Sequence, residues 1–248
     1  MPRILLLGGT QDAAEMAAAL ATAGLEAVYS LAGRTAAPTR PDLPTRIGGF
    51  GGVAGLAQWL AANRITHVID ATHPFAAQMS RNAIAACAAA GLPLVALQRP
   101  EWQPEPGDRW TRLPDIAAAV AHLPDAPARV FLAIGRQTLA PFAARPEHHY
   151  LLRLVDPPEA PLPLPQAEVV VDRGPFTVAG DTALLRRFRA DLIVAKNAGG
   201  RGASAKIAAA RALGLPILMI DRPALPDRAT VTTPAEAIHW LHATDRGV

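Results

Sequence analysis

Apolar residues occur along the first hundred positions in short blocks that alternate with alanine-rich stretches. Blocks such as residues 4–7 contain no polar side chain, which is typical of strands buried on both faces. Several alanine-rich stretches end at a glycine such as Gly24, a common helix C-cap. The pattern predicts strands at 4–7, 27–31, around 45–47, 66–70 and 94–97, and helices at 10–23, 51–63 and 76–90.

The second half of the chain repeats this alternation, with predicted strands at 130–134, 192–195 and 217–220 and a helix at 203–213. A last helix is predicted from Thr233, because Glu236 completes a capping box and Pro234 occupies the first helical position. The proline-rich sequence at 157–165 is too rigid for a flexible linker. We expect it to form a structured crossover or surface loop between the halves.

Strands that alternate with helices favour parallel sheets covered by helices on both faces. Residues 91–100 match residues 214–223, and 3–11 match 129–137 at almost the same offset. Shared turn punctuation could produce such matches, but a duplicated architecture explains both. We therefore predict an α/β fold of two Rossmann-like units, 1–100 and 101–248, with a ligand cleft between them.

The offset between the halves also sets His73 opposite Lys196. Both would lie in loops at the carboxyl ends of equivalent strands. Ligands of open α/β sheets bind at that edge.

Composition narrows the class of protein. Half of the 248 residues are hydrophobic, yet no apolar run approaches the roughly 18 residues of a transmembrane helix. The first residues lack the pattern of a signal peptide, so we expect a soluble, cytoplasmic protein. The formal charge is only +3 and the basic residues are scattered, which argues against a nucleic-acid partner. The single cysteine, Cys87, excludes an intramolecular disulfide and a cysteine metal cluster.

Gly8-Gly9-Thr10 follows the first predicted strand, as in the dinucleotide-binding fingerprint. Glycines there allow a tight turn and close backbone approach, and the following helix presents N–H groups to a pyrophosphate. The third glycine of the fingerprint is absent, with Ala13 or Ala14 where the helix must pack closely on the strand. A plain strand-to-helix turn remains the alternative.

The end of the second predicted strand bears on the choice of cofactor. An NAD site usually has an acidic residue there, whereas residues 29–34 contain no acid and end in Arg34. Arginine can pair with a 2′-phosphate through two parallel hydrogen bonds, so NADP is favoured unless Arg34 is incidental. The run at 48–52, GGFGG, suits a backbone pressed against a ligand with Phe50 flanking a ring, or else a flexible loop.

Residues 68–76, VIDATHPFA, admit three interpretations: a metal site, a helix start or part of a ligand pocket. A metal site is disfavoured because His67 lies at the opposite end of the strand from His73, and no H-x-x-x-H or H-E-x-x-H pattern occurs. Thr72 could cap the next helix. The chain also lacks a hydrolase nucleophile elbow and a Walker A pattern.

Candidate anion-binding groups occur in the second half. The glycine-rich run at 199–204 opens a predicted helix beside Lys196 and Asn197, where backbone N–H groups could bind carboxylates. Arg136 and Arg201 are expected to begin helices, and Arg173 precedes a Gly-Pro-Phe turn. These loops predict a cationic lobe that faces the nucleotide lobe. Only two of the 24 basic residues are lysines, Lys196 and Lys206, and both fall in this region.

Taken in order, these motifs resemble the precorrin-6A reductase family, NADPH-dependent enzymes of aerobic cobalamin biosynthesis. The resemblance runs from Leu5 to about Pro223, and the DATHPFA and KNxGG elements together are specific to that family. Ala198 departs from the usual serine, which puts in doubt a role for that side chain but not for its neighbours. The motifs are GGT at 8–10, GR at 33–34, GGFGG at 48–52, DATHPFA at 70–76, GR at 135–136, RGPF at 173–176 and KNAGG at 196–200.

The resemblance implies NADPH in the first domain and the tetrapyrrole between the domains. A hydride and a proton would be added in the C18–C19 region of precorrin-6A to give precorrin-6B, with His73, Lys196 or a water as proton donor. The implied cofactor contacts are Gly8, Gly9, Thr10, Gln11, Asp12, Arg34, Gly49, Phe50, Gly51 and Thr72. The implied substrate contacts are Phe75, Arg136, Arg173, Phe176, Asn197, Gly199, Gly200 and Arg201. No metal ion is expected.

Three alternatives stay open. A cobalt-precorrin-6A reductase of the anaerobic route would use NADH, against which Arg34 argues. A non-catalytic NADP-sensing protein would not need the cationic lobe, and a periplasmic-type binding protein would need a signal peptide. We expect a monomer that contacts neighbouring pathway enzymes only transiently.

Overall fold

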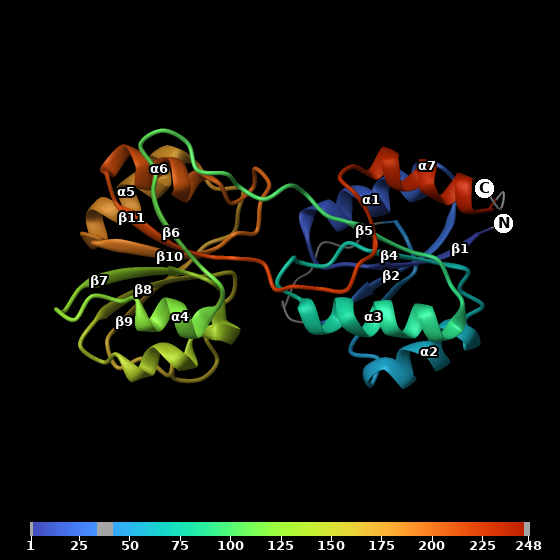
Figure 1. Ribbon diagram of the computed structural model, residues 1–248, viewed down its shortest axis with the longest axis horizontal. Coiled ribbons are helices and arrows are strands. Elements are labelled where there is room, and N and C mark those ends of the chain that lie inside the picture. The colour runs from blue at the N-terminus through green and yellow to red at the C-terminus, as the bar shows by residue number, and fades with distance from the viewer. Residues whose placement is uncertain (1, 34–41, 246–248) are drawn as a thin grey trace. The chain divides into compact units, whose positions relative to one another are not determined.

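The computed structural model describes residues 2–33 and 42–245 (Figure 1). The chain divides into two compact units, here called unit 1 (Met1–Pro100 and Ala224–Val248) and unit 2 (Glu101–Pro223). This division corrects the expected second domain of 101–248. Residues 224–248 belong to unit 1, because their strand joins the sheet of unit 1 and their helix packs there.

Unit 1 is built on a parallel sheet in the order β12-β5-β4-β1-β2-β3. Helices α1 and α7 cover one face of this sheet, and α2 and α3 cover the other (Figure 1). The strands are β1 (Arg3–Leu7), β2 (Glu26–Leu31), β3 (Thr45–Ile47), β4 (His67–Asp70), β5 (Leu94–Leu97) and β12 (Ala229–Val231). The helices are α1 (Gln11–Thr22), α2 (Gly52–Ala62), α3 (Ala77–Ala90) and α7 (Pro234–Asp245).

Unit 2 repeats this plan with a parallel sheet in the order β6-β11-β10-β7-β8-β9. Helices α5 and α6 cover one face, and α4 lies on the other with two short 3₁₀ turns (Figure 1). The strands are β6 (Arg109–Leu113), β7 (Arg129–Ala133), β8 (His149–Leu154), β9 (Ala167–Val171), β10 (Leu192–Lys196) and β11 (Pro216–Ile220). The helical elements are α4 (Ile116–Ala121), η1 (Arg136–Thr138), η2 (Ala140–Ala144), α5 (Val178–Phe188) and α6 (Ala205–Leu213).

The two sheets exchange their sixth strands. β6 follows β5 along the chain but pairs with β11, and β12 follows β11 but pairs with β5. Each sheet thereby completes the 3-2-1-4-5-6 strand order of doubly wound nucleotide-binding sheets. Because of this exchange, unit 1 consists of two separate segments of the sequence, and a single boundary cannot divide the chain into the two units.

The apolar blocks of the sequence form the centre of each sheet. Successive side chains of a strand point to opposite faces. Ile4 and Leu6 therefore pack in the cluster with α1 and α7, and Leu5 and Leu7 in the cluster with α2 and α3. All four are at most 1% exposed. A strand covered on both faces is the arrangement that the unbroken apolar run predicts.

Two expectations about the second half are wrong. The proline-rich sequence at 157–165 connects β8 to β9 inside unit 2 and does not join the halves. His73 and Lys196 also do not occupy equivalent positions in the two units. The connections between equivalent strands differ in length, so one sequence offset does not hold along the whole chain. Ile4 pairs with His67 as Val130 pairs with Leu192. By this register His73 corresponds to Ala198, two positions beyond Lys196.

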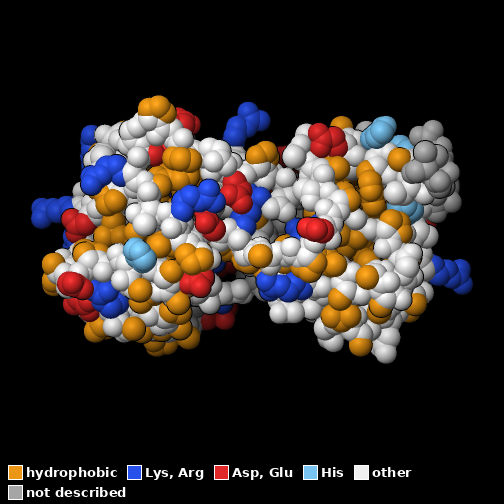
Figure 2. All heavy atoms as spheres, in the orientation of Figure 1, with side chains coloured by type: hydrophobic (Ala, Val, Ile, Leu, Met, Phe, Trp, Pro, Cys, Tyr) orange, Lys and Arg blue, Asp and Glu red, His pale blue; other side chains and the backbone are white. Residues whose placement is uncertain are grey.

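The described residues include no helix that is long and apolar enough to cross a membrane. On the face of the molecule shown in Figure 2, basic side chains are interspersed with acidic ones over both units.

Candidate functional site

Helix α1 begins at the carboxyl end of β1, and Thr10 fixes that start. The Thr10 hydroxyl accepts a hydrogen bond from the Ala13 N–H at 3.0 Å and donates one to the Ala71 carbonyl at 2.9 Å. The cap thus joins the helix to the end of the neighbouring strand β4. Gly9 is exposed, has a φ of 108° and has open space where a Cβ would stand. A pyrophosphate can therefore approach the main chain here.

The ring of Tyr29 leaves no room for a side chain at position 8. A Cβ at this position would stand 2.2 Å from the ring of Tyr29, which is 1% exposed. The Tyr29 hydroxyl accepts a hydrogen bond from the Gly9 N–H at 3.2 Å. Burial raises the pKa of this hydroxyl above its usual value, so it stays protonated at neutral pH. The first glycine of the motif makes room for a tyrosine that orients the second.

Gln11 and Asp12 occupy the first turn of α1, as expected of cofactor contacts. The Gln11 amide donates to the Glu15 carboxylate at 3.0 Å. Asp12 forms an ion pair with Arg99, which follows β5. Arg99 was not identified from the sequence. By compensating the carboxylate it removes a repulsive charge from the end of the helix where an anionic cofactor would bind.

The glycine-rich run at 48–52 connects β3 to α2. Gly48, Gly51 and Gly52 have φ values of 119°, 80° and 83°, so backbone conformation explains these glycines. Phe50 does not stand free, because it packs edge-on against Trp59 with ring centroids 5.4 Å apart. The run is thus an ordered turn with Gly49 exposed at its surface.

Arg46 of β3 organises this turn, and sequence reasoning missed it. Its guanidinium lies 3.8 Å from the centroid of the Phe50 ring. It donates to the Ser30 hydroxyl at 2.8 Å and to the carbonyls of residues 48 and 49 at 3.0 and 2.9 Å. Burial lowers the pKa of the guanidinium from its usual value. Arg34, the residue that the sequence favoured for a 2′-phosphate, lies outside the described residues.

Asp70 shapes the turn after β4. Its Oδ1 accepts hydrogen bonds from the Thr72 N–H at 3.1 Å and the Thr72 hydroxyl at 2.7 Å. The expected capping of the next helix by Thr72 is wrong, because α3 starts farther on without a side-chain cap. His73 is exposed, and its Nδ1 accepts from the Phe75 N–H at 3.2 Å. The two rings lie 5.9 Å apart. The turn thus holds His73 and Phe75 at the carboxyl edge of the sheet, beside the Thr10 cap.

At the carboxyl edge of the sheet in unit 2, Lys196 ends β10. Its Nζ donates to the Thr138 hydroxyl at 3.2 Å, and Thr138 donates to the Ile134 carbonyl at 3.2 Å. Thr138 lies in η1, which begins at the exposed Arg136 after the adjacent strand β7. The structure therefore brings Lys196 and the Gly-Arg loop together. Arg201 is also exposed, but it does not begin a helix, because α6 starts four residues later.

Asn197 holds the main chain of Trp102. It is 0% exposed, its Oδ1 accepts from the Trp102 N–H at 2.9 Å, and its Nδ2 donates to the Trp102 carbonyl at 3.1 Å. The Trp102 indole donates to the Gly200 carbonyl at 2.7 Å. Arg222 donates to the carbonyls of Asn197 and Ala198. The loop at 196–200 thus holds both the segment that enters unit 2 and the segment that leaves it.

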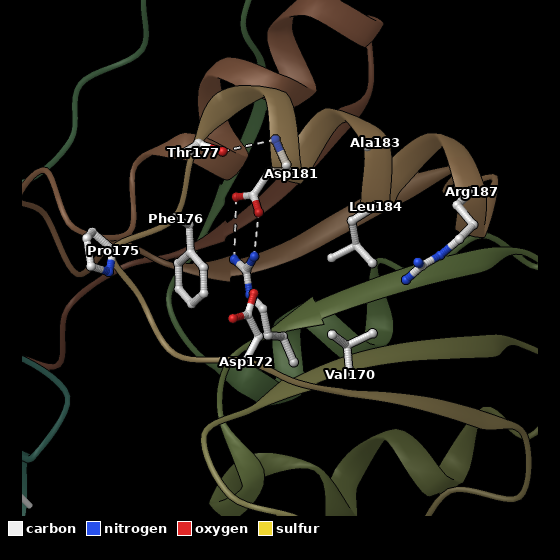
Figure 3. Close-up of a pocket in the computed structure, with 11 residues that line it drawn as sticks. Val170, Asp172, Pro175, Phe176, Thr177, Asp181, Ala183, Leu184 and Arg187 are labelled. Atoms are coloured by element: carbon white, nitrogen blue, oxygen red, sulfur yellow. Dashed lines mark hydrogen bonds and ion pairs between the residues drawn. The ribbon is translucent and has the colours of Figure 1, made fainter.

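The RGPF segment lies at the same edge, after β9. Figure 3 shows Phe176 beside the ion pair of Asp181, in a pocket of about 400 Å³. The partner of Asp181 is Arg153 of β8, whose guanidinium lies 3.5 Å from the Phe176 ring centroid. The exposed Arg173 is 3.9 Å from Asp156. The pocket is lined by Arg153, Val170, Asp172, Pro175, Phe176, Thr177, Gly180, Asp181, Ala183, Leu184 and Arg187.

The side chain of Lys206, the second lysine of this region, is buried and held by its neighbours in unit 2. Lys206 is 5% exposed, donates to the Ala203 carbonyl at 2.5 Å and lies 4.7 Å from the centroid of the Trp102 ring. Within residues 2–33 and 42–245, no group of three or more His, Cys, Asp or Glu side chains is arranged to hold a metal ion.

Comparison with known proteins gives a consistent result. The family model described as "Precorrin-6x reductase CbiJ/CobK" matches residues 3–242. The chain is 62% identical to a precorrin-6A reductase of Rhodobacter capsulatus, with 100% of both chains covered. It is 50% identical to one of Rhodococcus erythropolis, over 99% of this chain and 100% of the other. A solved structure described as "CobK precorrin-6A reductase" is similar with a TM-score of 0.94 at 62% identity, covering 98% of this chain and 97% of that one.

Proposed function

The chain belongs to the precorrin-6x reductase CbiJ/CobK family, and we propose that it reduces precorrin-6A to precorrin-6B with NADPH in aerobic cobalamin biosynthesis. The observation that carries the proposal is the near full-length match to a relative, 62% identical, that is named for precorrin-6A and not for its cobalt form. The alternative is reduction of cobalt-precorrin-6A with NADH.

The carboxyl edge of unit 1 fits a dinucleotide cofactor. Thr10 caps the N-terminus of α1, and the exposed Gly9 leaves the main chain open to a pyrophosphate. Asp12, the acid nearest this helix start in sequence, is paired with Arg99. The glycine-rich turn at 48–52 and the turn at 70–73 end the strands on either side of β1 and β2. We assign three segments to the cofactor: the start of α1, the turn at 48–52 and the turn at 70–73.

The hydride comes from the bound nicotinamide cofactor, so the residues of the chain bind, orient and supply a proton. We propose that His73 in its charged imidazolium form donates a proton to the macrocycle and becomes a neutral imidazole. The contact of its Nδ1 with the Phe75 N–H, at 3.2 Å, orients the ring. The Lys196 ammonium, which the Thr138 hydroxyl positions, is the second candidate.

Unit 2 supplies cations for the carboxylate groups of the macrocycle. We assign this role to Lys196, Arg136, Arg173 and Arg201, of which the three arginines are exposed. Asn197, Gly199 and Gly200 are assigned instead to the shape of their loop, since the Asn197 amide is bonded to Trp102 and Gly199 is buried. Phe75 and Phe176 are left as candidate apolar contacts.

Following NADPH absorbance with precorrin-6A and with cobalt-precorrin-6A side by side tests the proposal. We expect consumption with the metal-free substrate and slower or no consumption with the cobalt form or with NADH. Faster turnover of the cobalt form with NADH would establish the anaerobic alternative. Binding of NADPH without any consumption would indicate a sensor.

A further inference from the structure

Ser30 and Arg46 meet at the carboxyl end of β2. Ser30 lies about 20 residues after the glycines of the first turn, the position where a dinucleotide-binding unit selective for NAD has an acid for the ribose hydroxyls. Here the side chain at that position is a hydroxyl, and Arg46 from the paired position of β3 donates to it at 2.8 Å. A guanidinium therefore stands where the ribose 2′ position would lie.

Arg46 has no carboxylate within ion-pair distance in the described part of the chain. Its partners among the described residues are the Ser30 hydroxyl, two carbonyls of the glycine-rich turn and the faces of Phe50 and Trp59. The side chain is half-buried. A partly desolvated cation that is surrounded only by neutral groups is stabilised when an anion binds beside it.

The contacts of Arg46 also fix its orientation. Nη1 and Nη2 point to the carbonyls of residues 48 and 49, and Phe50 supports the plane of the guanidinium. Nε has no partner among the described residues, and Nη2 has one donor beyond its bond to the turn. Two donors on one edge of a rigid guanidinium match a phosphate in the two-bond geometry that arginine prefers.

We propose that Arg46 binds the 2′-phosphate of the cofactor and so determines selectivity for NADPH over NADH, an inference that rests on the proposed function. Arg46 then has two roles: it binds the phosphate, and it holds the glycine-rich turn through the carbonyls of that turn. Arg34 is not required for the selectivity.

The experiment measures the dissociation constants of NADPH and NADH by fluorescence for wild type, Arg46→Gln and Arg64→Gln. Arg64 is exposed in the turn between α2 and β4, at the opposite edge of the sheet, so its variant controls for the loss of one positive charge. We expect Arg46→Gln to weaken NADPH by about ten- to a hundredfold, the range for a hydrogen-bonded charge, and NADH by less than about threefold. Arg64→Gln should leave both unchanged.

An equal loss of both cofactors in Arg46→Gln would mean that Arg46 only holds the turn, and would overturn the inference. A preference for NADPH that survives in Arg46→Gln would overturn it while leaving the proposed cofactor intact. A wild type that binds NADPH no better than NADH would instead contradict the proposed cofactor itself. If Arg46→Gln does not fold, Arg46→Lys replaces it. We expect this variant to retain part of the preference, and a full wild-type preference would contradict two-bond binding.

Discussion

Both units have an arginine stacked on a phenylalanine at the carboxyl edge of the sheet, but the two arginines differ in charge compensation. Arg46 lies 3.8 Å from the Phe50 centroid and Arg153 lies 3.5 Å from that of Phe176. Arg153 stands in β8 at the position that Ser30 occupies in β2. It is paired with Asp181, and the two side chains are 8% and 3% exposed.

The difference in charge compensation shows which of the two stacked arginines is suited to bind a phosphate. In unit 2 the buried carboxylate of Asp181 already neutralises the arginine, so the stacked pair stabilises the unit. In unit 1 the guanidinium meets only a hydroxyl, carbonyls and aromatic faces among the described residues. Of these two stacked arginines, Arg46 is the one left available to a phosphate, and a single acidic residue, Asp181, separates the two outcomes.

The largest effect is expected from Asp181→Asn. The substitution leaves Arg153 buried and unpaired, so the free energy of unfolding should fall by about 3–5 kcal/mol. Urea denaturation measures it. The matched control is Glu168→Gln, which breaks the more exposed contacts of Glu168 with Arg129 and His149 and should cost less than about 1 kcal/mol. Equal effects of the two variants would show that Arg153 and Asp181 are not the buried pair on which the comparison depends.

Next in size is Gly8→Ala in unit 1. The new methyl group would lie 2.2 Å from the Tyr29 ring, and displacing this buried ring should lower the free energy of unfolding by about 1–3 kcal/mol. Gly49→Ala is the control, because no heavy atom of the described residues, apart from its chain neighbours, lies within 4 Å of its added Cβ, and its φ lies outside the left-handed region. Thermal unfolding compares the two. A variant at Gly8 as stable as the one at Gly49 would remove the explanation given for this glycine.

Lys196→Ala separates the roles of the two units. We expect it to lower kcat/KM for precorrin-6A by about tenfold or more, which corresponds to the loss of roughly one charge-assisted contact. The dissociation constant of NADPH should not change, since Lys196 belongs to unit 2. Steady-state kinetics and cofactor titration check both parts. Weakened NADPH with normal turnover of the macrocycle would reverse the assignment.

The smallest expected effect concerns Cys87 in α3. Burial, and next the nearby Asp70, raise the pKa of its thiol to about 12. A folded-state pKa above the ordinary value of 9.0 means that the thiol contributes stability below pH 9 and loses it as the pH rises toward 12. Native protein at pH 8 should therefore react with iodoacetamide far more slowly than unfolded protein. Equal labelling rates would contradict the buried environment.

The sequence predicted β1 to β5 in unit 1 and β7, β10 and β11 in unit 2, and it missed β6, β8, β9 and β12. Unbroken apolar blocks such as that of β1 located most of the inner strands, because burial on both faces leaves a clear pattern. The inner strand β8 lacks such a block, since His149 and Arg153 interrupt its apolar residues. The outer strands β6, β9 and β12 are partly exposed and carry mixed residues, so no such pattern marks them. Nothing in a local pattern indicates that β6 and β12 exchange sheets, since strand pairing is set by distant partners.

Motifs located the loops of the candidate site but not the partners that hold them. Gly8-Gly9-Thr10 marked the start of α1, yet the contact that requires Gly8 comes from Tyr29, a residue of another strand. Arg46 is one arginine among many in the sequence, and only its register opposite Ser30 distinguishes it. The family resemblance implies that Asn197 is a substrate contact. Its bonds to Trp102 depend on a segment far away in the chain.

Ser30→Asp is the sharpest test of the role of Arg46, because it gives unit 1 the carboxylate that unit 2 already has. The new acid would stand beside the Arg46 guanidinium and neutralise it, at the position where NAD-selective units have an acid. The measurement is the ratio of the dissociation constants of NADH and NADPH before and after the substitution. We predict that the preference for NADPH is lost or reversed while the protein stays folded. A folded Ser30→Asp variant that still prefers NADPH as wild type does would contradict the account.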